Sequence, residues 1–318
     1  MSILSWIVVA AAVSFRSLGA PAPQVRREYV ELHMGVAVRI VLYAADDAAA
    51  RRAARAAYAR IAALEAIMSD YRPESEVRRL AAMPGLDIRV SEHLFAVLAR
   101  ALELARLSDG AFDPTVGPFV ELWRAARRSG RLPERTALDS AAARVGWRKV
   151  HLDSATRSVR IDVGGMRLDL GGIAKGYILD QARAALAQEG VTRALLEAGG
   201  DITVGDPPPG LPGWRIEIPG AGECIRARSH TLANATVSTS GDTEQFVVIA
   251  GVRYSHVVDP HTGLGLTNRR QATVVAPDGA TADGLATALT VLDEEQHAAL
   301  LRAFPNVVAF RSRRCLSD

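Results

Sequence analysis

The sequence predicts a mixed α/β fold with antiparallel-rich sheets and flanking helices. Helical and strand-like segments do not alternate regularly along the 318 residues, because groups of short strands are separated by single helices. Alanine-rich segments carry apolar residues at helical spacing, whereas β-branched runs are bounded by Gly and Asp turns. This order of elements argues against a doubly wound parallel sheet.

The N-terminal half begins with strands and continues with three predicted helices. Residues 28–44, EYVELHMGVAVRIVLYA, alternate as a pair of strands or as one long strand. Residues 45–67 are alanine-rich and start with acidic residues that suit a helix N-terminus. Residues 91–108 form a second helix with Ser91 as its N-cap, and residues 117–128 form a shorter third one.

The C-terminal half is richer in strands. Residues 149–170 are β-rich, with turns marked by Asp-Ser and Gly-Gly, and a helix is expected over residues 173–188. Residues 192–205 are typical of strand, tight turn and strand. Residues 207–276 contain a proline-rich loop followed by short strands, and two helices within residues 281–304 are expected to close the chain.

Composition excludes some partners and indicates a compartment. The hydrophobic fraction of 49% is that of a folded globular protein, and the net charge of +3, without basic stripes, argues against nucleic acid as a partner. Residues 1–24 pair an apolar run with small residues and prolines, which predicts a signal peptide and export to the periplasmic side of the inner membrane. An uncleaved leader would associate the domain over residues 25–318 loosely with the membrane. Cys224 and Cys315 are expected to be separate thiols, with a single disulfide as the alternative.

Six junctions combine glycine with polar or acidic residues. Each offers backbone N–H groups that suit a phosphate, and the aspartates suit a hard cation that bridges phosphates. One such junction would be ordinary turn chemistry, but six in one chain favour a shared polyanion site. The G-x-G-x-x-G and P-loop motifs are absent. The six are AFDPTVGP (111–118), DLGGIAKG (169–176), EAGGDI (197–202), STSGD (238–242), YSHVVDPHTG (254–263) and DGATADGLAT (278–287).

Two features of these junctions point to specific chemistry. Of 38 Lys and Arg residues only Lys149 and Lys175 are lysine, and a compact ammonium in a glycine-rich turn can place a point charge on a phosphate. The alternative for Lys175 is an ordinary surface lysine. Asp283 and Thr287 lie four residues apart, so on a helix their oxygens share one face and suit Mg²⁺. In isolation, a helix-terminal Asp and a back-bonded Thr would be the simpler interpretation.

In order along the chain, the motifs resemble those of the ApbE family, the FAD:protein FMN transferases. MSDYRPESEVRRL (68–80) is similar to the family's tyrosine-then-Ser-Glu segment, and FDPTVGPFVELW (112–123) to its F-D-P-T-V-G-P-L-x-x-L-W stretch. DLGGIAKGYILD, GGDI, SGD, YSHVVDPHTG and ADGLAT then follow in family order. The resemblance covers roughly residues 30–295. Glu197 departs from it, since a small or amide residue is more usual there.

The resemblance implies an enzyme with an FAD site between two subdomains. It would use Mg²⁺ to transfer the FMN half of FAD to a Thr or Ser hydroxyl of an acceptor flavoprotein, and release AMP. The implied metal ligands are Asp283, Thr287 and the carbonyl of Ala174. Lys175 would act on the phosphates, and His256 would be the catalytic base, with Asp242 as the fallback. The implied contacts to the cofactor are Met34, Tyr71, Ala111, Phe112, Asp113, Asp169, Gly171, Lys175, Gly200, Asp201, Ser240 and Val257.

Other interpretations stay open at this point. An Mg²⁺-dependent FAD pyrophosphatase would use the same metal residues and hand FMN to water, giving FMN and AMP. A non-catalytic flavin-binding protein would not need Asp283, Thr287 or His256. For single residues the alternatives are structural: a turn residue for Asp242, a satisfied histidine for His256 and core packing for Met34 and Tyr71.

Overall fold

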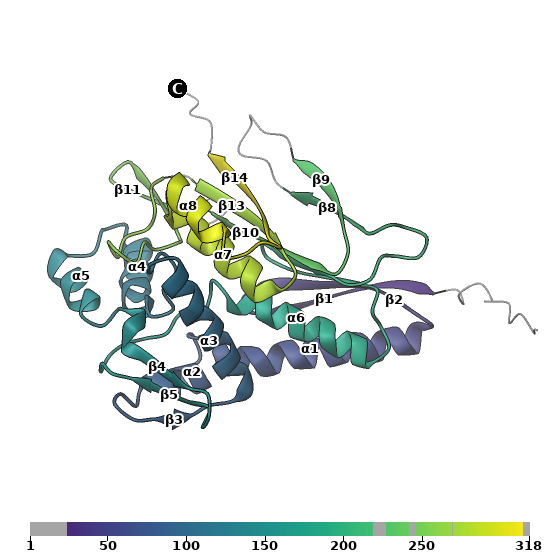
Figure 1. Ribbon diagram of the computed structural model, residues 1–318, viewed down its shortest axis with the longest axis horizontal. Coiled ribbons are helices and arrows are strands. Elements are labelled where there is room, and N and C mark those ends of the chain that lie inside the picture. The colour runs from purple at the N-terminus through teal and green to yellow at the C-terminus, as the bar shows by residue number, and fades with distance from the viewer. Residues whose placement is uncertain (1–23, 219–226, 242–245, 269, 314–318) are drawn as a thin grey trace, which may run out of the picture.

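A seven-stranded sheet forms the centre of the molecule (Figure 1). The computed structural model describes residues 24–218, 227–241, 246–268 and 270–313. Every neighbouring pair of strands in this sheet is antiparallel, which confirms the predicted fold class. In spatial order the strands are β1 (Val25–His33), β2 (Val36–Ala44), β6 (Ala194–Ala198), β7 (Asp201–Val204), β10 (Ala235–Gly241), β13 (Arg270–Ala276) and β14 (Val308–Arg313).

Three helices that carry or support the site pack against each other and against this sheet. Helices α1 (Asp47–Met68) and α6 (Ala174–Gln188) lie side by side, and α7 (Gly279–Val291) packs on α6, β10 and β13 (Figure 1). Half of the buried residues of α1 are alanine, and these small side chains allow close approach. Asp46 caps α1, since its side chain accepts a hydrogen bond from the Ala49 N–H.

A hairpin packs on part of the sheet through a second apolar cluster. The hairpin consists of β8 (Trp214–Ile218) and β9 (Arg228–Leu232). It buries Trp214 and Ile216 against residues of the sheet that include Val41 and Val204. Alternation along β8 explains this, because every second residue of the strand is buried and the others are exposed.

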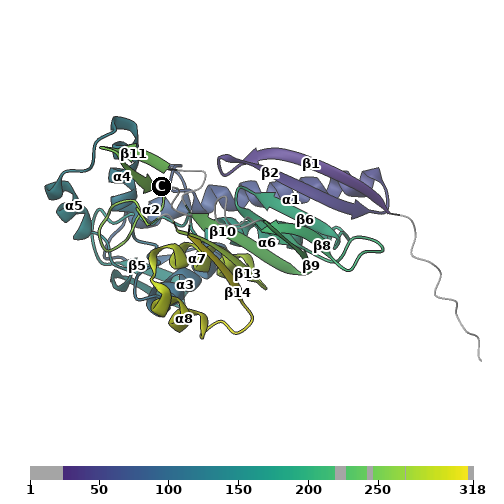
Figure 2. The ribbon, with the colours of Figure 1, turned by 90° about the horizontal axis from the view of Figure 1, so that it is seen from above.

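The remaining elements gather at one end of the molecule (Figure 2). A third apolar cluster joins two of the helices to a separate hairpin through Trp123 and Tyr254, among others. The Trp123 indole also donates a hydrogen bond of 3.1 Å to the carbonyl oxygen of Ser255. The elements here are α3 (Glu92–Leu107), α4 (Gly117–Ser129), α5 (Arg135–Ala142), the sheet of β3 (Ile88–Arg89), β5 (Ser158–Ile161) and β4 (Val150–Asp153), and the hairpin of β11 (Phe246–Ile249) and β12 (Val252–Ser255).

Most predicted elements are present, but the end of the chain and two short helices differ from the prediction. Residues 28–44 are two strands, joined by a turn in which Met34 (φ 52°) and Gly35 (φ 74°) are left-handed. Both helices expected within residues 281–304 are present, but the prediction that they close the chain is wrong. After α8 (Glu294–Leu301) the chain returns as β14 and pairs with β13 at the edge of the main sheet. Short helices α2 (Glu76–Ala81) and α5 were not expected either.

Several predictions concern residues outside the described part of the chain. Residues 1–23, Asp242, Cys224 and Cys315 all lie there, so the leader, the fallback base and the cysteines stay predictions. Within the described ranges, no helix combines the length and the apolar character needed to cross a membrane.

Candidate functional site

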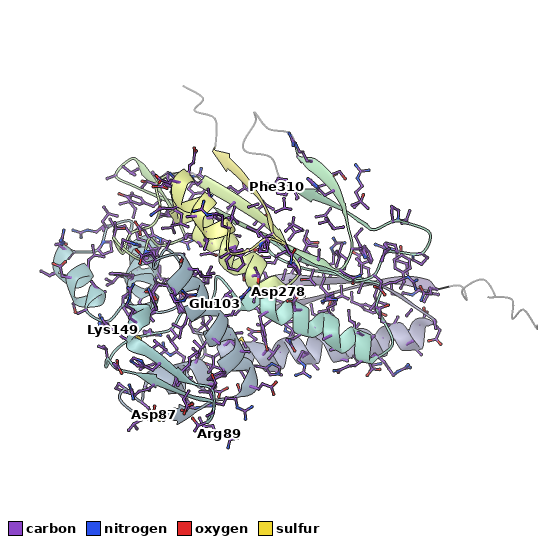
Figure 3. The ribbon with its side chains drawn as sticks, in the orientation of Figure 1. Asp87, Arg89, Glu103, Lys149, Asp278 and Phe310 are labelled. Carbon is purple, nitrogen blue, oxygen red and sulfur yellow. The ribbon has the colours of Figure 1, made fainter. Side chains whose placement is uncertain are left out.

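The site is built around a close crossing of α6 and α7. A Cβ added to Gly176 would collide with the backbone of Gly279, and one added to Gly279 would collide with that of Gly176. Glycine at both positions lets the two helices approach with their backbones in contact. Asp278, which lies where α7 begins (Figure 3), caps that helix by accepting the Thr281 N–H. The crossing therefore holds α7 against the glycine-rich turn that precedes α6.

Asp180 of α6 anchors the crossing to the sheet. Its Oδ2 accepts a 2.6 Å hydrogen bond from the Gly279 N–H, and its Oδ1 accepts one of 3.4 Å from the Thr236 hydroxyl on β10. Burial raises the pKa of Asp180 to about 6, although the bond from Gly279 favours the ionised form. The native protein therefore holds this proton more tightly than the unfolded chain does.

The Asp180→Asn variant should show the cost of this buried carboxylate. Because the native pKa lies above the unfolded value, Asp180 stabilises the fold at low pH, and this contribution is lost as the pH rises through about 6. The free energy of unfolding of the variant, relative to wild type, should therefore increase by about 1 kcal/mol between pH 5 and pH 7. Urea denaturation of both proteins across this range measures the difference. A difference that does not change with pH would contradict the assignment.

Lys175 lies between two buried carboxylates at this crossing. Its Nζ is 2.5 Å from Oδ2 of Asp201 on β7 and 3.5 Å from Oδ1 of Asp283 on α7. The other oxygen of Asp283 accepts a 3.2 Å hydrogen bond from the Gly176 N–H, and the other oxygen of Asp201 accepts one from the Ser238 hydroxyl. Burial lowers the pKa of Lys175, but the charges of Asp201 and Asp283 outweigh this and raise it above its ordinary value. Lys175 therefore carries a positive charge at neutral pH.

Thr287 lies one helical turn beyond Asp283 and contacts the glycine-rich turn that precedes α6. Its hydroxyl is 3.2 Å from the Ser240 hydroxyl at the end of β10 and 3.5 Å from the carbonyl oxygen of Gly172. A Cβ on Gly172 would lie 2.8 Å from the Thr287 Oγ1, so glycine is needed for this approach. Asp283 is not the helix cap, since Asp278 holds that position.

The donors at this point fit a hard divalent cation. Two buried carboxylates, those of Asp201 and Asp283, share Lys175 as an ion-pair partner, so one negative charge is left over when both are ionised. Burial, reinforced by the charge of Asp201, raises the pKa of Asp283 to about 7. No cluster of three or more His, Cys, Asp or Glu side chains suited to a metal occurs in the described part of the chain. A cation here would therefore be held by mixed carboxylate, hydroxyl and carbonyl oxygens, as Mg²⁺ prefers.

Lys175→Arg should impair the reaction although it keeps the charge. The planar guanidinium is larger than an ammonium and cannot occupy the same point between Asp201 and Asp283. We expect turnover to fall by roughly a hundredfold, the scale of loss for a reacting group displaced by about 1 Å. The control is Lys149→Arg. Lys149 donates to the carbonyl oxygens of Ala143 and Val145, and its charge acts on Asp113 rather than on Asp201 or Asp283. Because Lys149→Arg keeps this charge, the variant should turn over normally. Equal rates for both variants would show that Lys175 has no special role.

Four of the six glycine-containing junctions meet at Lys175. Lys175 of the first junction contacts Asp201 and Asp283, which belong to two others. The remaining junction of the four joins through two hydrogen bonds, between Ser238 and Asp201 and between Ser240 and Thr287. These junctions are residues 169–176, 197–202, 238–242 and 278–287. In the second of them, Gly200 accepts a 2.9 Å hydrogen bond from the Thr239 N–H. The junction at 111–118 joins through a 2.8 Å hydrogen bond from the Asp169 N–H to the carbonyl oxygen of Pro114.

An exposed aromatic ring is linked to the Asp169 turn through Arg124. Tyr71 is 74% exposed, and the Arg124 guanidinium lies 4.1 Å from the centroid of the Tyr71 ring. Arg124 also contacts Asp70 at 2.6 Å and Asp169 at 3.6 Å. Asp169 in turn accepts a 2.8 Å hydrogen bond from the Gly171 N–H. Burial, together with the charge of Asp70, raises the pKa of Asp169.

The predicted flavin-contacting turn has internal bonding of its own. One carboxylate oxygen of Asp113 accepts hydrogen bonds from the N–H and hydroxyl of Thr115, and the other accepts one from the Trp147 N–H. Ala111 and Phe112 are buried beside it. Met34 is partly buried against the main core, at the turn between β1 and β2. The flavin contacts of these residues stay predictions.

His256 and Val257 directly follow β12 in a tightly bonded loop. The Val257 N–H donates to the Ser255 hydroxyl at 3.0 Å, and the Val257 carbonyl accepts from the Leu266 N–H at 3.0 Å. His256 is partly buried. The loop is tied to α4 through Trp123 and Ser255, and the next residue of that helix is Arg124, which contacts Asp169.

Sequence reasoning missed several polar residues of the site. Asp70, Asp180 and Ser238 stand inside quoted motifs, so their motif membership was an available signal. Arg124 gave no signal of its own. Glu197, which departs from the family pattern, has a structural partner: its carboxylate forms a 2.6 Å ion pair with Arg39 on β2.

The fold and the site together define a mixed α/β protein with a lysine–dicarboxylate centre at converging glycine-rich turns. The chain belongs to the ApbE family, which it matches over residues 34–311.

Individual relatives agree with this membership over most of their length. The chain is 35% identical to the FAD:protein FMN transferase of Treponema pallidum (strain Nichols), over 89% of this chain and 84% of that protein. It is 32% identical to the enzyme of that name from Klebsiella pneumoniae (strain 342), over 86% and 85%. Among solved structures, it resembles an ApbE protein of Thermotoga maritima (TM-score 0.79, 31% identity, 90% and 97% covered). It also resembles the flavin transferase ApbE of Vibrio cholerae (TM-score 0.80, 29% identity, 90% and 93% covered).

Proposed function

We propose that this chain is an Mg²⁺-dependent transferase that moves the FMN moiety of FAD onto a Thr or Ser hydroxyl of an acceptor protein and releases AMP. The similar proteins named above as FAD:protein FMN transferases support the reaction. The observation that carries it in this chain is the position of Lys175 between Asp201 and Asp283 at the crossing of α6 and α7. A fixed cation beside spare carboxylate charge suits a pyrophosphate and its metal.

Each residue then has a defined part in the transfer. The acceptor hydroxyl attacks the phosphorus on the FMN side of the pyrophosphate, the bond from that phosphorus to the bridging oxygen breaks, and AMP leaves. His256 takes the hydroxyl proton. Lys175, held by Asp201, stabilises the negative charge that develops on the phosphate oxygens.

The metal would be held by Asp283, Thr287 and the carbonyl of Ala174. When bound, Mg²⁺ neutralises pyrophosphate charge that would otherwise repel the nucleophile. The backbone N–H groups of the glycine-rich turns complete the phosphate contacts. The Tyr71 ring offers an exposed surface on which a flat ring system can stack.

The test is mass spectrometry of a candidate acceptor protein after incubation with the enzyme, FAD and Mg²⁺. We expect a mass gain that corresponds to FMN on a Thr or Ser residue, with one AMP released per modification. Incubation with FAD alone measures hydrolysis. If free FMN and AMP form at a rate that no acceptor changes, and no acceptor is modified, the protein is a pyrophosphatase and not a transferase.

Export is part of the same proposal. Residues 1–24 have the composition of a leader, and the acceptor would then lie on the periplasmic side of the inner membrane. N-terminal sequencing of the protein recovered from the periplasmic fraction tests this, because cleavage near residue 24 is expected.

A further inference from the structure

Arg124 is the common partner of two segments that are far apart in the sequence, residues 70–71 and the turn at Asp169. Its guanidinium lies over the ring of Tyr71 at 4.1 Å and forms ion pairs with Asp70 at 2.6 Å and Asp169 at 3.6 Å. The Arg124 side chain is 26% exposed, so these interactions are partly shielded from water.

The exposed ring of Tyr71 is the unusual member of this cluster. A tyrosine that is 74% exposed has little packing to hold its ring in one orientation. Arginine supplies the missing support from one side, because its planar guanidinium stacks on an aromatic face. The opposite face of the ring then remains available to a ligand.

The same guanidinium also supports the phosphate side of the site. Asp169 orients the turn before α6 by accepting the Gly171 N–H, and that turn leads to Lys175 four residues later. Asp70 and Asp169 are both carboxylates within reach of Arg124, and without a cation between them they would repel each other.

We infer that Arg124 is a positioning residue that couples recognition of the flavin ring at Tyr71 to recognition of the pyrophosphate at the Asp169–Gly171 turn. This inference rests on the proposed function for the identity of the ligand. The planar guanidinium of Arg124 stacks on the Tyr71 ring, and its positive charge acts on Asp169 in the turn before α6. The two contributions can therefore be separated by substitution.

Arg124→Lys keeps the charge but loses the planar stack, whereas Arg124→Gln loses both. We expect Arg124→Lys to weaken FAD binding by about tenfold, within the range of a cation–π contact, and to leave ADP binding within about twofold of wild type. Arg124→Gln should weaken binding of both ligands. Titration calorimetry with FAD and with ADP measures these affinities.

A double-mutant cycle tests whether Arg124 acts through Tyr71. Tyr71→Ala alone should weaken FAD binding by about tenfold or more, as expected for a lost stacking contact. Added to Arg124→Lys, it should cause less than about a further twofold loss, because the ring has already lost its support. The inference would be overturned if the loss of FAD affinity in the double variant equalled the product of the two single losses. Wild-type FAD affinity in Arg124→Lys would overturn it as well.

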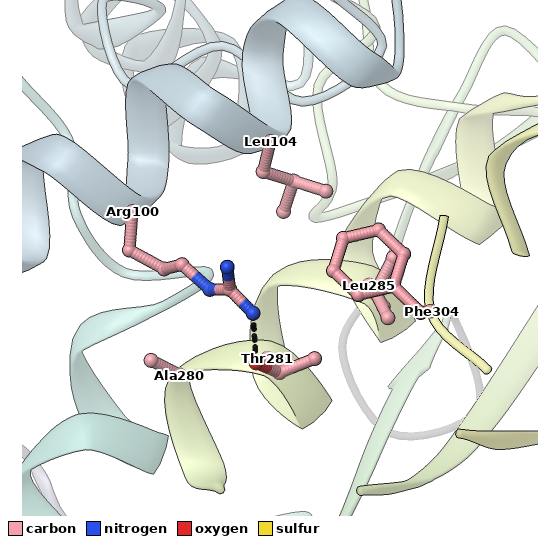
Figure 4. Close-up of a pocket in the computed structure, with 6 residues that line it drawn as sticks. All are labelled: Arg100, Leu104, Ala280, Thr281, Leu285 and Phe304. Carbon is pink, nitrogen blue, oxygen red and sulfur yellow. Dashed lines mark hydrogen bonds between the residues drawn. The ribbon is translucent and has the colours of Figure 1, made fainter. Parts of the chain in front are cut away.

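Arg100 provides a matched control. It also lies over an aromatic ring, that of Phe304 at 5.5 Å, and it donates a 2.6 Å hydrogen bond to Thr281 (Figure 4). Thr281 and Leu285, which line that small hollow with Arg100, lie two residues from Asp283 and Thr287 and therefore on the opposite side of α7. Arg100→Lys should leave FAD and ADP affinities unchanged. If it reduced them as Arg124→Lys does, a general loss of stability would be the cause.

A readout without ligand separates this inference from the proposed function. In protein labelled with 3-fluorotyrosine, the Tyr71 resonance is assigned by Tyr71→Phe. In Arg124→Lys the Tyr71 resonance should change its chemical shift and become narrower, because the ring becomes free to move. In Arg100→Lys it should stay unchanged. An unchanged Tyr71 resonance in Arg124→Lys would show that Arg124 does not support the ring. Failure of the wild-type protein to bind FAD would count against the proposed function instead.

Discussion

Asp283→Ala should abolish FMN transfer. Asp283 contributes the only full negative charge among the proposed metal ligands, because Thr287 and the Ala174 carbonyl are neutral. Its side chain is buried at the crossing of α6 and α7, where water has little access to replace it. We therefore expect no transfer above background in a mass-spectrometric assay, and no Mg²⁺ binding by calorimetry in the presence of FAD.

Two further variants separate charge from structure at this position. Asp283→Asn keeps an acceptor for the Gly176 N–H but removes the charge, and it should be as inactive as Asp283→Ala. Asp278→Asn changes another carboxylate of α7 and should be active, since Asn caps a helix as well as Asp does. Thr287→Ala should be impaired but partly restored by high Mg²⁺, because water replaces a neutral ligand more easily than a carboxylate. An active Asp283→Ala variant, or full wild-type activity in excess chelator, would remove the metal from the mechanism.

His256→Ala should slow transfer far more than it weakens FAD binding. A general base typically contributes about a hundred- to ten-thousand-fold in rate, whereas the dinucleotide contacts through the glycine-rich turns are unchanged by the substitution. Single-turnover rates with saturating FAD, set beside FAD affinities from calorimetry, separate the two effects.

His261 is the control for His256 in the same loop. It lies five residues further on and pairs with Asp259 at 3.4 Å, with 59% of its side chain exposed. His261→Ala should therefore transfer FMN at close to the wild-type rate. A collapse of FAD affinity in His256→Ala would instead make His256 a ligand-contacting residue, and similar rate losses in both variants would point to disruption of the loop.

The parts of the fold that could be predicted are those whose signal is local. Helix α6 was expected from residue 173 and begins at Ala174, because periodicity and the glycine-rich start are both contained in that segment. Strand β14 was missed because it is a short run at the end of the chain, and its pairing with β13 is a tertiary fact. Helix α2, of only six residues, offers too little periodicity to be recognised.

The candidate site shows the same division. Lys175 could be singled out because lysine is rare in this chain, and Asp283 with Thr287 because they share a helical face. That Asp201 would be the nearer partner of Lys175 could not be predicted, since it depends on how β7 packs beside α6. Arg124 is one of several arginines in α4, and only the packing of that helix distinguishes it from Arg127 and Arg128, which are exposed.

The crossing of α6 and α7 also has a consequence for the order of folding. Lys175 and Asp283 are 108 residues apart in the sequence, so their pairing requires closure of a long loop. Contacts of such high sequence separation form late, because their entropic cost is met only after local structure exists. During refolding from urea, helical signal should therefore begin to return before the protein regains its ability to bind FAD. The interval between the two measures the delay before α7 docks on α6.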